Sequence, residues 1–512
     1  MIDGAAIGRS PVISSWHGYN PASSQQQCLQ AVQTSLPTTD GDRERRRSMA
    51  LRTSTKQASD AMDIREAVKA SVAAESKDSK LWGFVPNWFR TTVGPLFLIL
   101  VPPFFVVFWW HLLVSHSGSW VSLWGDLKAA GPEYVLDVVP SPVDPAAWKY
   151  ILGFGVFEIL LMVGLPGKAF RANPTATGHI PVYKANGMLS YLVTLATLCA
   201  LVATDRLDPK NVYDKLGEIF TGLSVFSLFF VLLLTVKGLY FPSTDDSGSN
   251  GSFLQNYWWG TELYPRVFGA DVKMFTNCRF GMMYWAVGAV IYAYTQQQMY
   301  GKLSSSMAVS VILQLTYITK FFHWEMGYMN SMDIQHDRAG YYLCWGCLVW
   351  VPAVYSSPGI YLVKHPISLG WYGASAILAL GLLSIWANFD ADRQRHAFRQ
   401  AKGDIIVWGK PAKYITAGYI NARGEKASSL LLCTGWWGVA RHFHYLPEIT
   451  GAFFWTVPAL FETPTPYFYV VFLVLLLTDR AFRDDTRCRG KYGKHWDKYC
   501  AQVPYKIVPG IL

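Results

Sequence analysis

The chain has 512 residues and a formal net charge of +10, with 51% hydrophobic and only 16% charged residues. A soluble domain carries roughly 25% charged residues, so the composition argues against a soluble protein and for a membrane protein. Basic loops on one side of a membrane explain the positive excess better than nucleic-acid binding does, and we expect no nucleic-acid partner. The eight scattered cysteines do not form the pattern of a disulfide framework.

Residues 1–80 are rich in Ser, Thr, Gln and charge and lack a sustained apolar period. This pattern predicts a disordered tail at 1–80 and a single transmembrane domain at 81–512. No cleavable signal peptide is evident, so the first span would itself direct the chain to the membrane.

Apolar segments follow one another through the rest of the chain. Residues 93–114 form a run of 22 without Asp, Glu, Lys or Arg, about the length that a helix needs to cross a bilayer. The last stretch, 449–477, is interrupted at 462–466 by two prolines, which predicts two segments. We therefore expect an all-α polytopic membrane protein with nine or ten spans. The other candidates are 151–165, 188–204, 219–236, 280–295, 307–322, 341–355 and 371–387.

Charge predicts the orientation of these spans. Eight Lys or Arg residues lie within 390–426 and eight more within 480–506, so both segments should be cytosolic. Counting spans backwards places 237–279 and 324–340 on the same side.

Ionisable residues gather between two of the apolar segments. If this stretch is helical, Glu325, Asp333, His336 and Asp337 project close to one stripe. Such a group at a membrane boundary is costly unless it lines a cavity or carries function. A metal site is conceivable, but a structural or proton-relay cluster is favoured and no metal is expected. Glu158 and Glu462 are also flanked by apolar residues, and a functional and a structural role are equally open for each of the two carboxylates.

Residues 435–445, with the basic carboxy terminus, combine aromatic and cationic side chains. Such a surface suits a dinucleotide, because rings stack on Trp and Tyr and phosphates pair with Arg and Lys. An interfacial aromatic belt explains the same composition equally well. No GxGxxG or Walker sequence occurs.

From about residue 88 the chain resembles the sterol reductase family, which includes Δ7- and Δ14-sterol reductases and the lamin B receptor. The features closest to the Δ7 enzymes of plants are Arg441-His442-Phe443, Tyr264 and the ending Val508-Pro509-Gly510. The matching stretches are 262–266, 271–275, 279–282, 332–346, 435–445, 483–485, 491–493, 503–505 and 509–510.

The resemblance implies a ten-helix enzyme of the endoplasmic reticulum membrane that uses NADPH to reduce the Δ7 double bond of a 5,7-diene sterol. Its partners would be the sterol, membrane lipid and other sterol-biosynthesis enzymes. It places the cofactor near the cytosolic face, against 388–512. The implied contact residues are Arg395, Arg399, Leu432, Trp437, His444, Tyr445, Asp484, Cys488, Arg489, Gly490, Lys491, Tyr492 and Tyr499.

An unactivated alkene also needs a proton, and an acid must therefore act with the cofactor. We expect it among Glu325, Asp333, His336 and Asp337, with Tyr264 and Tyr328 as donors or relays. Three alternatives stay open: a reductase acting at Δ14 or on the sterol side chain, a membrane methyltransferase, and a non-catalytic anchoring protein.

Overall fold

The computed structural model describes residues 88–512 except 132, 176 and 421–425, so the predicted tail at 1–80 lies outside the described residues. The chain divides into two units, and all described residues belong to the second, Ile64–Leu512. Within 88–512 and outside those gaps, seven helices are long and apolar enough to cross a membrane. They are Phe89–Ser115 (η2 and α3), Pro145–Gly164 (α6), Leu216–Tyr240 (α9), Ser305–His323 (α12), Tyr341–Lys364 (α15, η4 and α16), Gly370–Gln400 (α17) and Thr465–Tyr492 (η6 and α20).

Three further predicted spans coincide with helices that fall short of these criteria. They are α7 (Gly187–Ala203), α11 (Met282–Tyr300) and α19 (Tyr445–Thr456). A polytopic membrane protein is therefore confirmed, whereas ten crossings stay a prediction. The remaining helices are α4 (Trp120–Ala130), α5 (Glu133–Val138), α8 (Pro209–Asp214), α10 (Phe253–Trp259), η3 (Met274–Gly281), α13 (Glu325–Tyr328), α14 (Met332–Gln335), α18 (Trp436–Val439), η5 (Val457–Ala459) and α21 (Lys494–Gln502).

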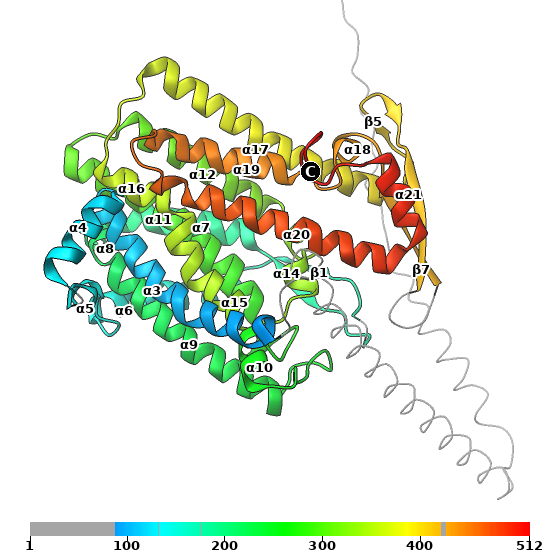
Figure 1. Ribbon diagram of the computed structural model, residues 1–512, viewed down its shortest axis with the longest axis horizontal. Helices are drawn as coiled ribbons and strands as arrows, with labels where there is room; N and C mark the ends of the chain where they lie inside the picture. Colours follow the sequence, from blue (N-terminus) through cyan, green and yellow to red (C-terminus); the bar gives the residue numbers. More distant parts are fainter. Residues whose placement is uncertain (1–87, 132, 176, 421–425) are drawn as a thin grey trace, which may run out of the picture. The chain divides into compact units, whose positions relative to one another are not determined.

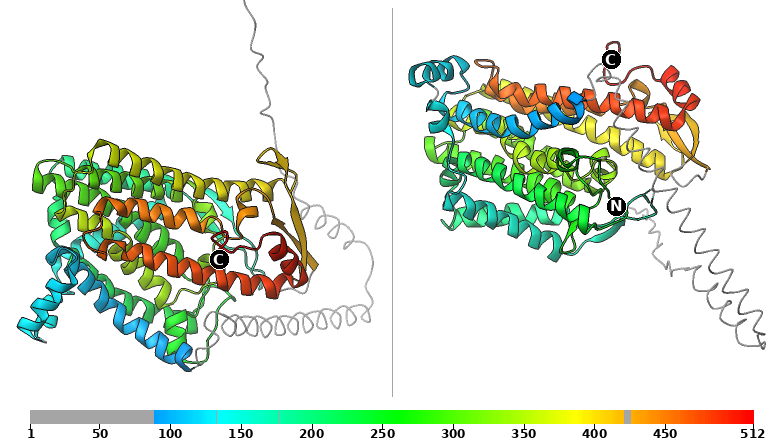
Figure 2. Two further views of the ribbon diagram at one scale, coloured as in Figure 1. Left: turned by 45° about the horizontal axis from the view of Figure 1, so that its top comes forward. Right: turned by 60° about the horizontal axis from the view of Figure 1, so that its bottom comes forward.

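The prediction of an all-α fold is wrong in one respect, because the described chain also contains four antiparallel hairpins. In the longest, Tyr414 pairs with Leu432 and Ile420 with Lys426. The strands are β1 (Lys168–Arg171), β2 (Val182–Ala185), β3 (Arg266–Val267), β4 (Ala270–Asp271), β5 (Ile406–Val407), β6 (Lys410–Pro411), β7 (Tyr414–Ile420) and β8 (Lys426–Leu432). Strands β5 to β8 and helix α21 lie at one end of the bundle, called the hairpin end below, and α4 and α5 lie at the other (Figures 1 and 2).

Local signals explain where the helices begin and end. The carboxylate of Asp144 accepts a hydrogen bond from the Ala147 amide at 2.8 Å and so caps α6, whose first residue is a proline. Ser304 caps α12 in the same way. Helix α11 ends at Gly301 in the left-handed conformation, with φ of 69°. The prolines at 464 and 466 separate α19 from α20, as predicted.

Apolar side chains cover the outside of the bundle and polar ones lie within it. Phe104, Leu160 and Phe229 are largely exposed, which is the arrangement of lipid-facing helices. Thr194, Ser227 and Ser310 are buried between helices, and the last two donate hydrogen bonds to backbone carbonyls. The polar interior can therefore present catalytic groups without exposing them to lipid.

Two π-helical segments, η3 and η4 (Gly346–Tyr355), pack against each other near the centre of the bundle. A side chain at Gly281 would lie 2.7 Å from the carbonyl oxygen of Cys347, so only glycine allows this approach. Widened π turns often occur at functional sites. Here the η3 segment carries Arg279, which reaches the predicted acid cluster.

Candidate active site

Helix α20 brings three of the four predicted acid-cluster residues together. Arg480 donates to the Asp333 carboxylate at 2.7 Å, and Arg483 donates to Asp337 at 3.3 Å. The third residue of the set, His336, accepts from a guanidinium nitrogen of Arg487 at 3.1 Å. Residues three and four apart share a face of a helix, so this spacing aims all three arginines at one segment. We call that segment, residues 332–337, the acid loop.

Burial changes the protonation of the acid loop. It raises the pKa of the Asp337 carboxyl, although the charge of Arg483 opposes this shift. Burial, together with the positive charges of Arg487 and Lys491, lowers the pKa of His336 to about 4. The ring nitrogen that accepts from Arg487 must be unprotonated, which agrees with that direction. At neutral pH His336 is therefore a neutral acceptor, and the Asp337 carboxyl holds its proton more readily than a carboxyl in water.

The single helical stripe expected for these residues does not form. Helix α12 ends at His323, and the chain then turns through the short helices α13 and α14. Glu325 pairs with the guanidinium of Arg279 rather than with the arginines that contact the acid loop. Its other oxygen accepts from the Gly187 amide at 3.0 Å, and Arg279 also donates to Asn186 at 2.9 Å. Glu325 thus joins η3, α7 and α13 in the interior.

Tyr264 packs against the acid loop through an apolar cluster and makes no contact with its carboxylates among the interactions of the described residues. It is buried in a small cluster with Met274, Cys278 and Ile334. Its ring lies 5.3 Å from the ammonium of Lys273, and burial raises the pKa of its hydroxyl. Tyr328, the other predicted relay, packs against the edge of the same cluster.

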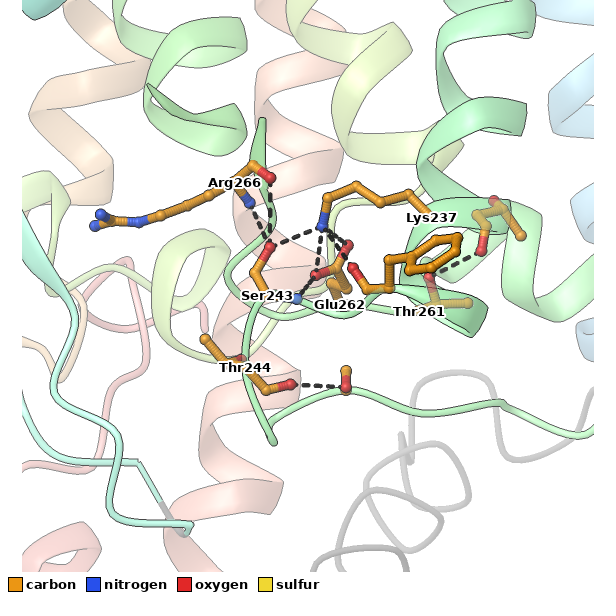
Figure 3. A network of polar contacts seen from close by, with 9 residues as sticks. Lys237, Ser243, Thr244, Thr261, Glu262 and Arg266 are labelled. Carbon is orange, nitrogen blue, oxygen red and sulfur yellow. Dashed lines mark hydrogen bonds and ion pairs between the residues drawn. The ribbon is translucent and has the colours of Figure 1, made fainter. Parts of the chain in front are cut away.

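A separate polar network fixes the segment that carries Tyr264 (Figure 3). The buried Glu262 carboxylate accepts from the Lys237 ammonium at 2.9 Å and from the amide of Ser243. The hydroxyl of Ser243 also accepts from the Arg266 amide at 2.9 Å. These contacts fasten the chain after α9 to the 262–266 motif and so support the position of Tyr264.

The predicted cofactor residues gather at the hairpin end. The guanidinium of Arg395, from α17, lies 4.5 Å above the ring of Trp437. Trp437 is held by a 2.8 Å bond to the Ala391 carbonyl and packs with Leu432 and Phe398. Arg399 lies one turn further along α17 and is exposed. Two cations and an indole therefore line the same face.

A second set of rings follows Trp437. The ring of His444 lies 5.0 Å from the Trp437 ring and 4.4 Å from that of Tyr445. His442 stacks on Tyr445 at 5.2 Å, and its Nε2 lies 3.6 Å from the Asp484 carboxylate. Burial lowers the pKa of His442 to about 4, so its ring is neutral at pH 7.

Nitrogen atoms of both histidines lack hydrogen-bond partners within the described part of the chain. They are Nε2 of His442 and Nδ1 of His444, and both are buried. Buried polar atoms normally find a partner, so these two fit a bound polar ligand. With the cations and rings beside them, the residues present fit a dinucleotide.

The rest of the predicted cofactor set lies on α20 and α21. Asp484 pairs with Arg487, and the Cys488 thiol lies 3.7 Å from the Asp484 carboxylate. Cys488 and Tyr499 are buried with Trp496, and Tyr492 packs at the edge of that cluster. An open cleft of about 560 Å³ lies beside it, lined by Ala412, Lys413, Tyr414, Cys433 and Gln502.

The exposed residues 489–491 contact other side chains or open space rather than the predicted cofactor residues around Trp437. Arg489 pairs with Asp497, and its other nitrogen lies 3.8 Å from Asp485. Lys491 lies over the ring of Tyr419, with its ammonium 4.2 Å away. Gly490 faces open space. Their contact with a cofactor stays a prediction.

Arg487 joins the acid loop to the predicted cofactor residues. It donates to His336 at 3.1 Å and pairs with the carboxylate of Asp484. The two groups, inferred separately from the sequence, are therefore neighbours along α20.

Sequence reasoning missed a third group beside them. The Tyr317 hydroxyl donates to the Glu448 carboxylate, whose other oxygen accepts from the Asn388 amide at 2.9 Å. The same Asn388 amide donates to the His444 carbonyl at 2.8 Å. The Tyr317 ring belongs to an aromatic cluster with Trp285 and Trp455, 5.6 and 5.2 Å away. Glu448 in an apolar segment was the available signal.

The other two flagged carboxylates differ from each other. Glu158 is fully buried and accepts from Thr194 at 2.6 Å, and its second oxygen has no partner among the described residues. Glu462 is exposed in the turn before α20. Neither reaches the acid loop through a contact in the described structure.

Comparison with known proteins identifies the family. The profile of the ergosterol biosynthesis ERG4/ERG24 family matches residues 91–512. The chain is 52% identical over 422 residues to 7-dehydrocholesterol reductase of Arabidopsis thaliana, covering 82% of this chain and 98% of the relative. It is 35% identical to Delta(14)-sterol reductase of Methylotuvimicrobium alcaliphilum, covering 85% and 99%. It is 33% identical to 7-dehydrocholesterol reductase of Xenopus laevis, covering 72% and 80%. The chain therefore belongs to the ergosterol biosynthesis ERG4/ERG24 family and is a membrane oxidoreductase that acts on a carbon–carbon double bond of a sterol.

Proposed function

We propose that this enzyme reduces the Δ7 double bond of 5,7-diene sterols with NADPH in the endoplasmic reticulum membrane. The observation that carries the proposal is the 52% identity to a 7-dehydrocholesterol reductase along nearly its whole length. The link that Arg487 makes between His336 of the acid loop and Asp484 of the predicted cofactor set supports it, because reduction of an alkene needs both a proton and an electron pair.

Bound NADPH would supply a hydride. Arg395 and Arg399 would pair with its phosphates, since guanidinium groups suit phosphate geometry. Trp437 and Tyr445 would pack against its rings, and the unpartnered nitrogens of His442 and His444 would bond its polar groups. Leu432, Cys488 and Tyr499 would form the apolar floor, as their burial beside these residues suggests.

Within the acid loop, we assign proton donation to Asp337. Burial raises the pKa of its carboxyl and so favours the form that carries the proton. The Asp333 carboxylate, which Arg480 contacts at 2.7 Å, would stabilise positive charge developing on the sterol. The aromatic cluster around Tyr317 would contribute in the same sense through its ring faces.

The experiment is expression in yeast that accumulates 5,7-diene sterols, followed by ultraviolet absorbance and mass spectrometry. Loss of the conjugated diene with a gain of two mass units establishes the reaction. The matched control is Asp337→Asn at equal protein abundance, which should leave the diene intact. An unchanged diene with well-expressed wild-type protein would refute the Δ7 assignment.

A second candidate is reduction at Δ14, because a bacterial Delta(14)-sterol reductase is 35% identical over 85% of this chain. Membranes from the same yeast, supplied with a Δ8,14-diene sterol and either NADPH or NADH, separate the two. Reduction of the 5,7-diene alone supports the proposal, and reduction of the 8,14-diene alone supports the alternative. The activity of these membranes with NADPH and with NADH identifies the cofactor. Fractionation of the same yeast then shows whether the protein lies in the endoplasmic reticulum and whether other sterol-biosynthesis enzymes accompany it.

A further inference from the structure

Lys273 is a buried lysine whose contacts all lead to the acid loop. It is 1% exposed, and its ammonium donates to the carbonyl oxygens of Asp333, Ile334 and Asp337 at 2.9, 2.7 and 2.7 Å. An ammonium has three hydrogens, so these three bonds use its whole donor capacity. Lysine is rarely buried so completely, because removing its charge from water is costly.

The position of Lys273 is itself fixed from behind. The neighbouring Asp271 accepts from the amide of Met274 at 2.9 Å and so caps the helical turn that carries Lys273 into η3. The ring of Tyr264 lies 5.3 Å from the ammonium. Lys273 is therefore a fixed point against which the acid loop is held.

The acid loop has little regular structure of its own. Only the four residues of α14 are helical, and Asp337 lies beyond its end. Three carbonyls gathered on one ammonium therefore set the backbone from which Asp333 and Asp337 extend towards Arg480 and Arg483.

We propose that Lys273 is a positioning residue for the reaction, holding the acid loop so that the Asp333 and Asp337 carboxyls meet α20 in their working geometry. This inference rests on the proposed function. Lys273 touches neither the substrate nor the cofactor in this scheme and acts only through the backbone of the acid loop. A misplacement of about 1 Å at a reacting group can lower turnover about 100-fold.

The charge of Lys273 gives the proposal a pH signature. Burial lowers its pKa to about 8, against the opposing effect of the carboxylates of Asp271, Asp337 and Asp333 and of the Cys344 thiol. Below that pH Lys273 is charged and its ammonium can make all three hydrogen bonds. Above it the ammonium loses a donor, one carbonyl is released, and turnover should fall.

The test compares three purified full-length variants with the wild type. Lys273→Met removes the donors, and Lys273→Arg keeps a charge throughout the accessible pH range. The control is Lys215→Met, because Lys215 also pairs with carboxylates, those of Asp144 and Glu218, and belongs neither to the acid loop nor to the network around Tyr264. Two readouts are taken: kcat and KM against pH, and hydrogen exchange of the amides in 332–337.

Lys273→Met should lower kcat about 10- to 100-fold with little change in KM, lose the alkaline limb near pH 8 and speed exchange in 332–337. Lys273→Arg should recover part of kcat without that limb. Lys215→Met should keep the wild-type pH profile per folded enzyme. Unchanged exchange, or a wild-type pH profile in Lys273→Met, would overturn the positioning role. Wild-type protein without reductase activity would instead overturn the proposed function. In that case the hydrogen-exchange measurement would still test whether Lys273 holds the acid loop in place.

Discussion

Two arginine–carboxylate contacts formed by the same short stretch of chain differ in almost every physical respect. The Arg279–Glu325 pair is sealed, with side chains 0% and 3% exposed, and both partners have additional hydrogen bonds. In the Arg480–Asp333 pair the side chains are 30% and 12% exposed, and the contact lies beside the predicted cofactor residues.

The difference teaches how to separate structural from chemical charge in this fold. A side chain at Gly187 would collide with the Glu325 carboxylate, so the surrounding backbone is built around that group. Within the described residues, no glycine approach of this kind is found at Asp333 and Asp337, whose arginine partners on α20 are about one third exposed. The sealed pair joins three elements and should resist change, whereas the partly exposed arginines leave the acid-loop contacts open to exchange of protons and partners.

The largest effect should follow from Asp337→Asn. Since the amide cannot donate the proton, kcat should fall about 10²- to 10⁴-fold while the protein accumulates normally. The assay measures turnover of a 5,7-diene sterol in detergent in the presence of NADPH. Asp497→Asn, which removes an exposed ion pair with Arg489, is the control and should leave kcat unchanged. Equal activity of Asp337→Asn and wild type would show that another residue donates the proton. Tyr317→Phe would then be the next variant to test.

Glu325→Gln should act on stability instead. It leaves the buried Arg279 charge without its counter-ion, which costs about 3–5 kcal/mol of unfolding free energy. We expect poor accumulation and a lowered thermal midpoint, with a near-normal pH profile for the enzyme that folds. A well-folded but inactive Glu325→Gln protein would contradict the division drawn above.

Arg395→Ala should weaken cofactor binding. Loss of a charge-assisted bond of about 1.5–3 kcal/mol should raise the KM for NADPH roughly 10- to 100-fold, with kcat much less affected. Arg393→Ala is a close control, because that arginine lies two residues away on α17 and pairs with Asp390. Equal changes in both variants would indicate a general effect of charge rather than a cofactor contact.

The smallest effect concerns acid stability. Burial holds the pKa of both His336 and His442 at about 4, below the ordinary value of 6.5. A depressed pKa stabilises the fold above pH 6.5, and this contribution disappears as the pH falls towards 4. His336→Gln should reduce the decline in thermal midpoint between pH 6.5 and 4 by a few degrees, roughly. A decline identical to that of the wild type would show that folding does not lower the pKa of His336.

Several features were predictable because their signals are local. Apolar runs and charge gaps located every long helix, although α17 and α20 continue to Gln400 and Tyr492, well beyond the predicted ends at 387 and 477. The prolines at 464 and 466 marked the break before α20. The spacing of Arg480, Arg483 and Arg487 could also have been recognised as one helical face.

The missed features depend on contacts distant in sequence. Glu325 was grouped with the acid loop because nothing local shows that α12 ends at His323 or that Arg279 lies opposite. Likewise, Tyr317 and Glu448 are 131 residues apart and meet only in the folded chain. The β7–β8 hairpin did have a local signal, since Tyr414–Ile420 is rich in β-forming residues and is followed by Asn421 and Gly424.

Helix α20 is one uninterrupted element of 25 residues. It carries the arginines that contact the acid loop and, interleaved with them, the predicted cofactor residues Asp484 and Cys488. A continuous helix moves as a rod, so a ligand that shifts one set of residues displaces the other with it. Occupancy of the two halves of the site is then thermodynamically linked, and the linkage is reciprocal. Sterol and reductant should therefore change each other's affinity by the same factor.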